Sequence, residues 1–260
     1  MAENIKDNPK SSNEWLSFTY VVIFALLIRI FVVELFFVPT GSMKLTILEN
    51  DYIFSTKYSY GFSKHSFPFS PPIFKGRIFA TAPERGDIVI FRPPMKMDIR
   101  YIKRLVGLPG DKIQLIDDLI YINDQPIKRE EMGVVKDEKG NSYEKYKETL
   151  PNEMSYYSYK TLQKYSNSAE NKFGNTEIFY VPSDKYFFLG DNRDESNDSR
   201  VDLGFVPFEN FIAKGQLVFF STKDLLWLED GPITQVVTRA WTWLSSIRIN
   251  RIFKSIYATD

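Results

Sequence analysis

The chain begins with one long apolar segment and then changes to short apolar runs separated by glycine and proline. Residues 15–28 contain no charged side chain, and the apolar character continues past Arg29 and Glu34 to Val38. A helix over residues 15–28 rises only about 21 Å, whereas the hydrocarbon core of a bilayer is about 30 Å thick. The pattern therefore predicts a membrane anchor over residues 15–38, in which either Arg29 extends toward one membrane face or a tilted span carries both charges.

Two other interpretations of this segment are a cleaved secretory signal and a buried core helix. A signal needs a positively charged start, but residues 1–14 mix lysine with aspartate and glutamate, and no small-x-small cleavage site follows. A buried helix usually carries a polar face, which this segment lacks. The numbers of Lys and Arg on the two flanks are similar, so charge does not predict the orientation of the anchor.

Beyond Val38 the pattern predicts a mainly β protein. Runs rich in Ile, Val, Tyr and Phe, bounded by turn residues, occur at residues 51–62, 76–81, 86–94, 98–127, 177–192 and 215–223. The predicted organisation is an N-terminal tail (1–14), the anchor (15–38), a β core (39–127 and 178–222) with a long excursion (58–84), an inserted polar subdomain (128–177) and a C-terminal tail (223–260).

The C-terminal tail returns to a helical period. Apolar residues recur at three- and four-residue steps between Pro232 and Tyr257, with four basic residues elsewhere and with Trp241 and Trp243 among them. This pattern predicts a basic amphipathic helix. It fits a membrane interface and packing on the protein's own core equally well.

Composition narrows the chemistry. The chain has 33 basic and 33 acidic residues, no cysteine and a single histidine. Without a positive excess, nucleic acid is not an expected partner. Thiolate nucleophiles and sites needing two imidazoles are excluded, so a nucleophile must be Ser, Thr, Lys or a carboxylate. The histidine, His65, lies in the excursion without an acidic or hydroxyl partner at motif spacing, and we expect a loop histidine with no special role.

Two stretches carry candidate chemistry in the first half of the chain. Directly after the anchor, Gly41 permits a sharp turn and has a hydroxyl residue on each side, Thr40 and Ser42. Further on, alternation along 99–106 places Lys103 on one strand face between Tyr101 and Leu105. If Lys103 is buried there, its pKa falls and it can act as a general base; the alternative is that it extends to water as most lysines do.

A third stretch, residues 187–200, changes from an apolar strand to an almost wholly polar loop. A calcium loop is excluded because Arg193 and Asn197 follow Asp191 where a carboxylate or amide and then a turn glycine are needed. A rigid loop held by its own Asp, Asn, Ser and Arg side chains and an ordinary solvated loop both remain open.

Together the three stretches resemble the signature boxes of the signal peptidase I family of membrane-anchored Ser/Lys proteases. PTGSM resembles the nucleophile box, RGDIVIF with YIKRLVGLPGD the lysine box, and GDNRDESNDSRVDLGFVP the C-terminal box. The resemblance covers residues 15–57, 85–127 and 178–221. One departure is Leu45, where the family usually has proline after Ser-Met-Lys. We expect a changed turn there with activity retained.

The resemblance implies a role for each matching residue. Ser42 would be the nucleophile and Lys103 its general base, while the Thr40 hydroxyl and the Ser42 backbone N–H would form the oxyanion hole. Ser196 would hydrogen-bond and orient the lysine amine. Asp198 and Arg200 would pair structurally beside the site. No metal and no cofactor are expected.

The resemblance also implies the substrate and the setting. Such enzymes remove signal peptides from secretory preproteins after small residues of the Ala-x-Ala type. The shallow apolar pockets would be formed by residues next to the catalytic pair: Phe36, Val38, Met43, Tyr101 and Ile102. Core packing is the alternative for each of these residues. The implied fold is an all-β catalytic core with a second β subdomain inserted, anchored in the bilayer of a bacterial cytoplasmic membrane with its catalytic face on the outer, periplasmic side.

Two alternatives stay open. A Ser/Lys protease dedicated to one substrate, such as a pilin-maturing enzyme, would use the same chemistry with narrower pockets. An anchored binding protein without activity would explain the anchor and the strands but not the three boxes.

Overall fold

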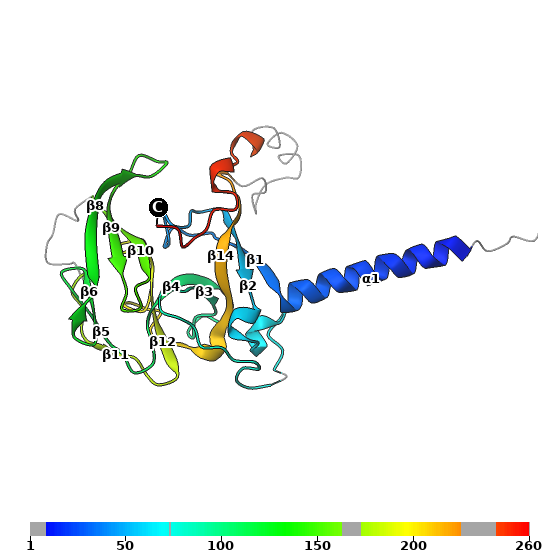
Figure 1. Ribbon diagram of the computed structural model, residues 1–260, viewed down its shortest axis with the longest axis horizontal. Helices are drawn as coiled ribbons and strands as arrows, with labels where there is room; N and C mark the ends of the chain where they lie inside the picture. The colour runs from blue at the N-terminus through cyan, green and yellow to red at the C-terminus, as the bar shows by residue number, and fades with distance from the viewer. Residues whose placement is uncertain (1–8, 73, 163–172, 225–242, 260) are drawn as a thin grey trace, which may run out of the picture.

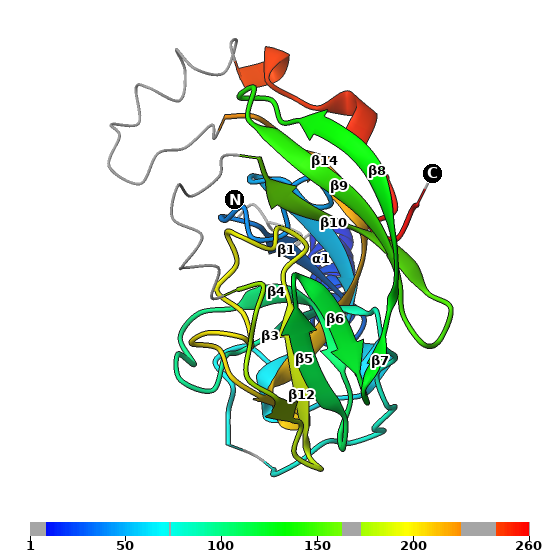
Figure 2. The ribbon, with the colours of Figure 1, turned by 90° about the vertical axis from the view of Figure 1, so that its left-hand side faces the viewer.

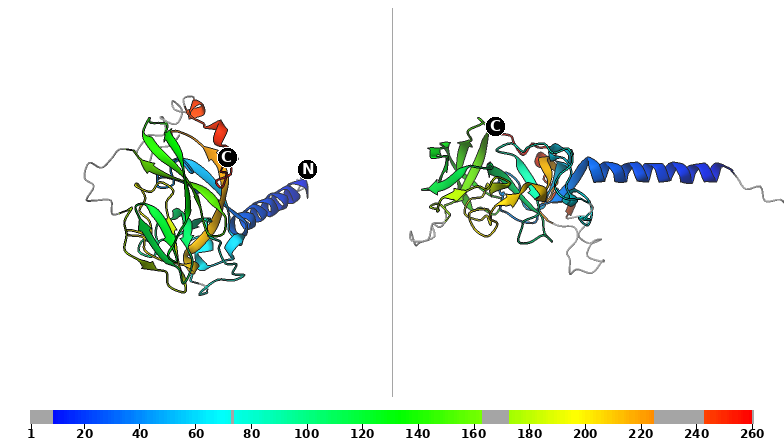
Figure 3. Two further views of the ribbon diagram at one scale, coloured as in Figure 1. Left: turned by 60° about the vertical axis from the view of Figure 1, so that its left-hand side comes forward. Right: turned by 90° about the horizontal axis from the view of Figure 1, so that it is seen from below.

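A long helix projects from a body made of β-strands (Figures 1 and 3). The computed structural model describes residues 9–72, 74–162, 173–224 and 243–259. Helix α1, Pro9–Phe31, contains a window from Glu14 to Phe31 that is apolar enough to cross a membrane and is 0% buried against the protein. The buried core helix is therefore the wrong interpretation. Arg29 lies in the last turn of α1, near one end of the span.

The predicted anchor is too long at its C-terminal end. Strand β1, Val33–Phe37, follows α1 and pairs antiparallel with β2, Asp51–Thr56. Glu34 forms ion pairs with Lys57 and Arg100, and Phe36 is 4% exposed within the core. A carboxylate finds no ion-pair partner in lipid, whereas Glu34 finds two in the β body. The helix therefore ends at Phe31, before Glu34.

The main sheet has seven strands and is antiparallel throughout. Side chains alternate across it, so Ile88 and Ile90 enter one hydrophobic cluster while Val89 and Phe91 enter another on the opposite face. Burial on both faces explains why the strand that carries these four residues, Ile88–Phe91, has no polar side chain. In sheet order the strands are β1, β2, β14 Phe211–Ser221, β3 Ile88–Phe91, β4 Tyr101–Gly107, β12 Lys185–Leu189 and β13 Val206–Pro207.

Two smaller sheets lie on the side of the body away from α1 (Figures 1 and 2). The first has three strands, in the order β10 Ser155–Thr161, β9 Ser142–Thr149 and β8 Lys128–Lys136. The second has four, in the order β11 Phe179–Tyr180, β5 Lys112–Ile116, β6 Leu119–Ile122 and β7 Gln125–Pro126. The polar segment 128–177 therefore does contain strands. The range 39–127 predicted for the core also includes β5 to β7, which belong to the four-stranded sheet.

The excursion 58–84 lies between β2 and β3 and contacts the end of α1. It contains two 3-10 helices, η1 Tyr58–Tyr60 and η2 Lys64–Ser66. Residues 76–81 form no full strand and contribute one bridge, from Ile78 to Phe62. The Phe31 ring packs edge-on against Phe62 and Phe67, with ring centroids 5.7 and 5.8 Å apart. The aromatic residues of this segment thus support the base of the helix.

The C-terminal tail differs from its prediction. Part of the expected amphipathic helix, residues 225–242, lies outside the described residues. From there on, only residues 243–245 are α-helical, and η4 Ile249–Arg251 is a single 3-10 turn. The tail forms two bridges: Ser255 lies opposite Leu217 of β14, and Ile247 lies opposite Thr222, the residue after β14. Ile256 is 3% exposed in the main core, so in the described part of the tail strand pairing and burial prevail over helical spacing.

Candidate active site

The nucleophile loop, residues 39–50, connects β1 to β2 and holds Ser42. Its base is closed where Val38 N–H donates to Asp51 O at 2.9 Å and Asn50 N–H donates to Val38 O at 2.9 Å. Inside the loop, Lys44 N–H donates to Gly41 O at 2.9 Å. This tight turn presents Ser42 as a buried residue, 8% exposed.

Lys103 of β4 meets Ser42 inside the protein. The Lys103 Nζ donates a hydrogen bond to Ser42 Oγ. Lys103 is 4% exposed, so it does not extend to water as the alternative required. Burial disfavours the ammonium and lowers the pKa of Lys103 from 10.5 to about 8, although the negative charges of Asp198 and Asp191 raise it. The structure thus places a serine hydroxyl beside an amine whose pKa is well below that of an ordinary lysine.

The polar loop after β12 is held by buried ion pairs. Arg200 donates to both carboxylate oxygens of Asp198, from Nε at 2.9 Å and from the terminal nitrogen at 2.8 Å. Although burial raises it, Arg200 holds the pKa of Asp198 below its ordinary value. On the opposite face of β4 from Lys103, Arg104 makes a matching two-bond pair with Asp191, at 2.8 and 2.7 Å. The solvated-loop alternative is therefore wrong, because most side chains of this loop are buried and its charges are paired.

Ser196 lies near Ser42 but does not bond Lys103. It is 3% exposed, and its hydroxyl has no hydrogen-bond partner among the described residues. Both serines adjoin Gly190, since a Cβ built on that glycine would lie 2.1 Å from Ser196 Oγ and 2.5 Å from the Ser42 carbonyl oxygen. Only glycine leaves room here. The hydrogen bond from Ser196 to the amine therefore stays a prediction.

Two residues that sequence reasoning did not single out hold the nucleophile loop. Asn192 N–H donates to Ser42 O at 3.2 Å, and its Nδ2 donates to Gly41 O at 3.1 Å and to Glu195 at 2.9 Å. Gly190 provides the space just described. Both belong to the quoted GDNRD motif, so the signal was present, but the loop-to-loop contact could not be derived from spacing.

A cleft of about 490 Å³ opens beside Ser42. Three of the expected pocket residues line it, namely Phe36, Tyr101 and Ile102, together with Thr40 at the exposed edge. The other two, Val38 and Met43, are 0% exposed in the main core, so for them the core-packing alternative holds. Side chains inside a turn follow no period, which is why their direction was not predictable. Further lining residues are Pro39, Glu49, Ile99, Arg100, Glu195 and Asn197.

His65 is remote from this chemistry. It lies in η2, with its backbone N–H bonded to Ser63 and its ring Nδ1 3.1 Å from Ser70 Oγ. Burial and nearby cations lower its pKa to about 4, so the ring is neutral at pH 7. The hydroxyl partner, Ser70, was not expected from the sequence. It lies five residues from His65 in the same excursion, away from Ser42 and Lys103 in the sequence.

Comparison with known proteins identifies the family. Residues 12–220 match the family model described as signal peptidase, peptidase S26. The chain belongs to the peptidase S26 signal peptidase family. It is 60% identical over 255 residues to signal peptidase I of Rickettsia canadensis (strain McKiel), covering 97% of this chain and 96% of that protein. It is also 60% identical over 262 residues to signal peptidase I of Rickettsia massiliae (strain Mtu5), covering 99% and 98%.

Among solved structures, the chain matches a crystal structure of a signal peptidase I from Enterococcus faecalis V583. The identity is 28%, the match covers 52% of this chain and 97% of that one, and the TM-score is 0.31.

Membership of the signal peptidase family settles the class of reaction. The enzyme is a serine peptidase that removes signal peptides from preproteins, and the non-catalytic binding alternative is wrong. The family is membrane-anchored, in agreement with the exposed apolar helix α1.

The departure at Leu45 has a structural counterpart. Leu45 has a φ of 73°, in the left-handed region. Proline, whose ring fixes φ near −65°, cannot adopt this conformation. A proline at position 45 would therefore require a turn different from the one that this chain forms.

Proposed function

We propose that this signal peptidase works through a Ser42–Lys103 dyad. The observation that carries the proposal is the buried hydrogen bond between Lys103 Nζ and Ser42 Oγ, with the pKa of Lys103 lowered to about 8 by burial. A lysine that is neutral in a useful fraction of molecules accepts the hydroxyl proton as Oγ attacks the scissile carbonyl. His65, the chain's single histidine, lies in η2 rather than at this pair.

The reaction proceeds through an acyl-enzyme. Attack by Ser42 Oγ forms the ester and breaks the peptide bond, and the protonated Lys103 gives its proton to the leaving amine. A water molecule then attacks the ester and gives a proton to the neutral Lys103, and Lys103 passes this proton to Ser42 Oγ as the acyl–Oγ bond breaks and the peptide acid leaves. The Thr40 hydroxyl and the Ser42 N–H would donate to the developing oxyanion, each worth about 3 kcal/mol when preorganised. Ser196 would hydrogen-bond and orient the amine.

We further propose that the cleft beside Ser42 selects small residues before the cut. Its wall contains Phe36, Tyr101 and Ile102, and the first and last of these are 4% exposed and packed in the core. Such a wall cannot retreat to admit a bulky side chain. An Ala-x-Ala sequence therefore fits, and a leucine directly before the cut should reduce cleavage by orders of magnitude.

The setting proposed for the enzyme is a bacterial cytoplasmic membrane. Helix α1 would cross the bilayer once, and the β body would lie on the outer face, where secretory preproteins emerge. The equal numbers of acidic and basic residues give no reason to expect nucleic acid as a partner. Protease protection in sealed, oriented membrane vesicles tests the orientation, since a body on the outer face is digested only in right-side-out vesicles.

Cleavage of several unrelated Ala-x-Ala preproteins by the full-length enzyme in detergent tests the mechanism. Ser42→Ala and Lys103→Ala should lose nearly all activity while remaining folded, and Lys103→Arg should also fail because guanidinium stays protonated. His65→Ala should retain activity. A fully active Lys103→Arg enzyme would show that the base is misassigned, and cleavage of only one preprotein would favour the dedicated protease.

A further inference from the structure

The nucleophile loop is strained and needs support from outside. Leu45, three residues after Ser42, has a φ of 73°, a left-handed conformation that is unfavourable for a residue other than glycine. The loop lies between two segments distant in sequence: the C-terminal tail and the tip of the β8–β9 hairpin. Both contact it directly.

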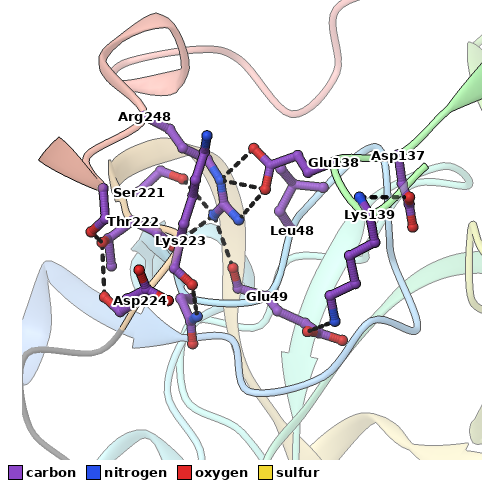
Figure 4. A network of polar contacts seen from close by, with 12 residues as sticks. Leu48, Glu49, Asp137, Glu138, Lys139, Ser221, Thr222, Lys223, Asp224 and Arg248 are labelled. Atoms are coloured by element: carbon purple, nitrogen blue, oxygen red, sulfur yellow. Dashed lines mark hydrogen bonds and ion pairs between the residues drawn. The ribbon is translucent and has the colours of Figure 1, made fainter. Parts of the chain in front are cut away.

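The C-terminal tail binds the loop through two arginines. Arg248, whose side chain is 8% exposed, donates to Glu49 O at 3.0 Å and to Thr222 O at 2.7 Å (Figure 4). Arg251 donates to Thr46 O at 3.0 Å and to the Asp51 carboxylate at 2.7 Å. Two carbonyl groups of the loop are thus satisfied by guanidinium groups from 199 and 205 residues away in the sequence.

The hairpin tip closes the arrangement from the other side. Glu138 accepts from Arg248 at 2.7 and 2.9 Å, so the tip holds the same guanidinium that holds the loop (Figure 4). Next to it, the buried Asp137 carboxylate pairs with Lys44 at 2.7 Å, and Lys44 also donates to Tyr143 at 2.9 Å. Although burial lowers it, these contacts raise the pKa of Lys44 above its ordinary value. This lysine is two residues from Ser42.

We propose that Arg248 and Arg251, together with residues 137–139, form a clasp that positions Ser42 against Lys103. The inference rests on the proposed dyad, in which Ser42 Oγ must stay within hydrogen-bond reach of the amine. Restraint at Lys44, Thr46 and Glu49 fixes the loop on the far side of Ser42 from β1. The arginines are positioning residues, because they touch the loop and not the reacting atoms.

The test compares kcat and KM for an Ala-x-Ala preprotein in the full-length enzyme and in Arg248→Gln and Arg251→Gln. Each variant is assayed at a temperature at which circular dichroism shows it fully folded. A displacement of the order of 1 Å at a reacting group can cost about a hundredfold in rate. We therefore expect kcat to fall between about tenfold and a hundredfold, with KM within about twofold. The midpoint of the acid arm of the pH–rate profile should stay unchanged, because the burial of Lys103 is unaltered.

Arg77 provides the matched control. It is a partly buried guanidinium that donates to the carbonyl oxygens of Gly61, Phe208 and Phe211 at 2.6 to 2.9 Å, outside the nucleophile loop. Arg77→Gln should lower the melting temperature comparably and leave kcat unchanged. Equal losses of kcat in the control and in the clasp variants would overturn the proposal, since general destabilisation would then explain both.

Glu138→Gln decides the matter if the arginine variants do not fold. The Glu138 side chain is 43% exposed, so replacing it removes no buried charge. Arg248 loses one ion-pair partner but keeps its hydrogen bonds to Glu49 O and Thr222 O. We expect a two- to fivefold fall in kcat, and an unchanged kcat would refute the clasp. Ser42→Ala separates this failure from that of the mechanism: if Ser42→Ala still cleaves, the dyad is wrong; if only the clasp variants retain full activity, the clasp is wrong.

Discussion

When Lys103 is protonated, its buried ammonium should lower the free energy of unfolding of the enzyme. Lys103 is 4% exposed, and burial lowers its pKa from 10.5 to about 8. Between these two pH values the folded protein has released a proton that the unfolded chain still holds. The free energy of unfolding therefore rises with pH across that window. Below pH 8 both states are protonated, and the buried charge costs about 3 kcal/mol, at 1.36 kcal/mol per pH unit.

Lys103→Met isolates this cost, because methionine fills a similar volume without a charge. The variant should be inactive. Its free energy of unfolding minus that of the wild-type enzyme should be about 3 kcal/mol larger at pH 7 than at pH 10.5, with the change falling between pH 8 and 10.5. Groups that titrate equally in both proteins cancel in this difference.

Urea unfolding in detergent, followed by circular dichroism at half-unit steps from pH 7 to 10.5, measures the difference. Lys128→Met is the control, because that lysine side chain is 71% exposed and its removal should give a difference that hardly changes with pH. A flat difference for Lys103→Met as well would refute the reasoning. It would mean that the folded protein holds Lys103 with an ordinary pKa.

Four further outcomes are expected. The kcat/KM of the wild-type enzyme should rise about tenfold per pH unit below pH 8 and level off above it, as Lys103 becomes neutral; a midpoint near pH 4 in the pH–rate profile would point to a carboxylate. Gly190→Ala should nearly abolish cleavage and lower stability by about 1 to 3 kcal/mol, because its Cβ would lie 2.5 Å from the Ser42 carbonyl oxygen; an active, stable variant in the same assays would contradict this. Leu45→Pro, the residue usual in the family, should cost more than about 1 kcal/mol in urea unfolding because φ is 73°, and Leu45→Gly should be close to neutral. Deleting residues 1–31 should leave cooperative thermal unfolding intact, whereas a deletion that also removes β1 should abolish it.

The pairing of Ser42 with Lys103 was expected from the resemblance of three motifs to a known family, whereas alternation alone left open whether Lys103 is buried. Period-two alternation placed Lys103 among apolar neighbours, and the strand is indeed buried there. Val38 and Met43 were assigned to pockets because they adjoin Ser42 in sequence, but no period governs a turn, and both face the core.

Long-range contacts were beyond reach for a different reason. The bond from Arg248 to Glu49 spans 199 residues, and no spacing rule links such positions. In the tail, three- and four-residue spacing suggested a helix through Ile256. In the structure Ser255 instead bridges to the bulged strand β14, and Ile256 is buried in the core. These contacts provide backbone hydrogen bonds and apolar burial without a helix.

The short connection between α1 and β1 gives the enzyme a fixed reach. A single residue, Val32, separates the helix end at Phe31 from the strand start at Val33. β1 has five residues and spans about 17 Å at 3.3 Å per residue. With α1 anchored in the bilayer, the cleft cannot stand much farther from the lipid than this strand allows. The enzyme would then select Ala-x-Ala sequences by their distance from the membrane surface as well as by their side chains.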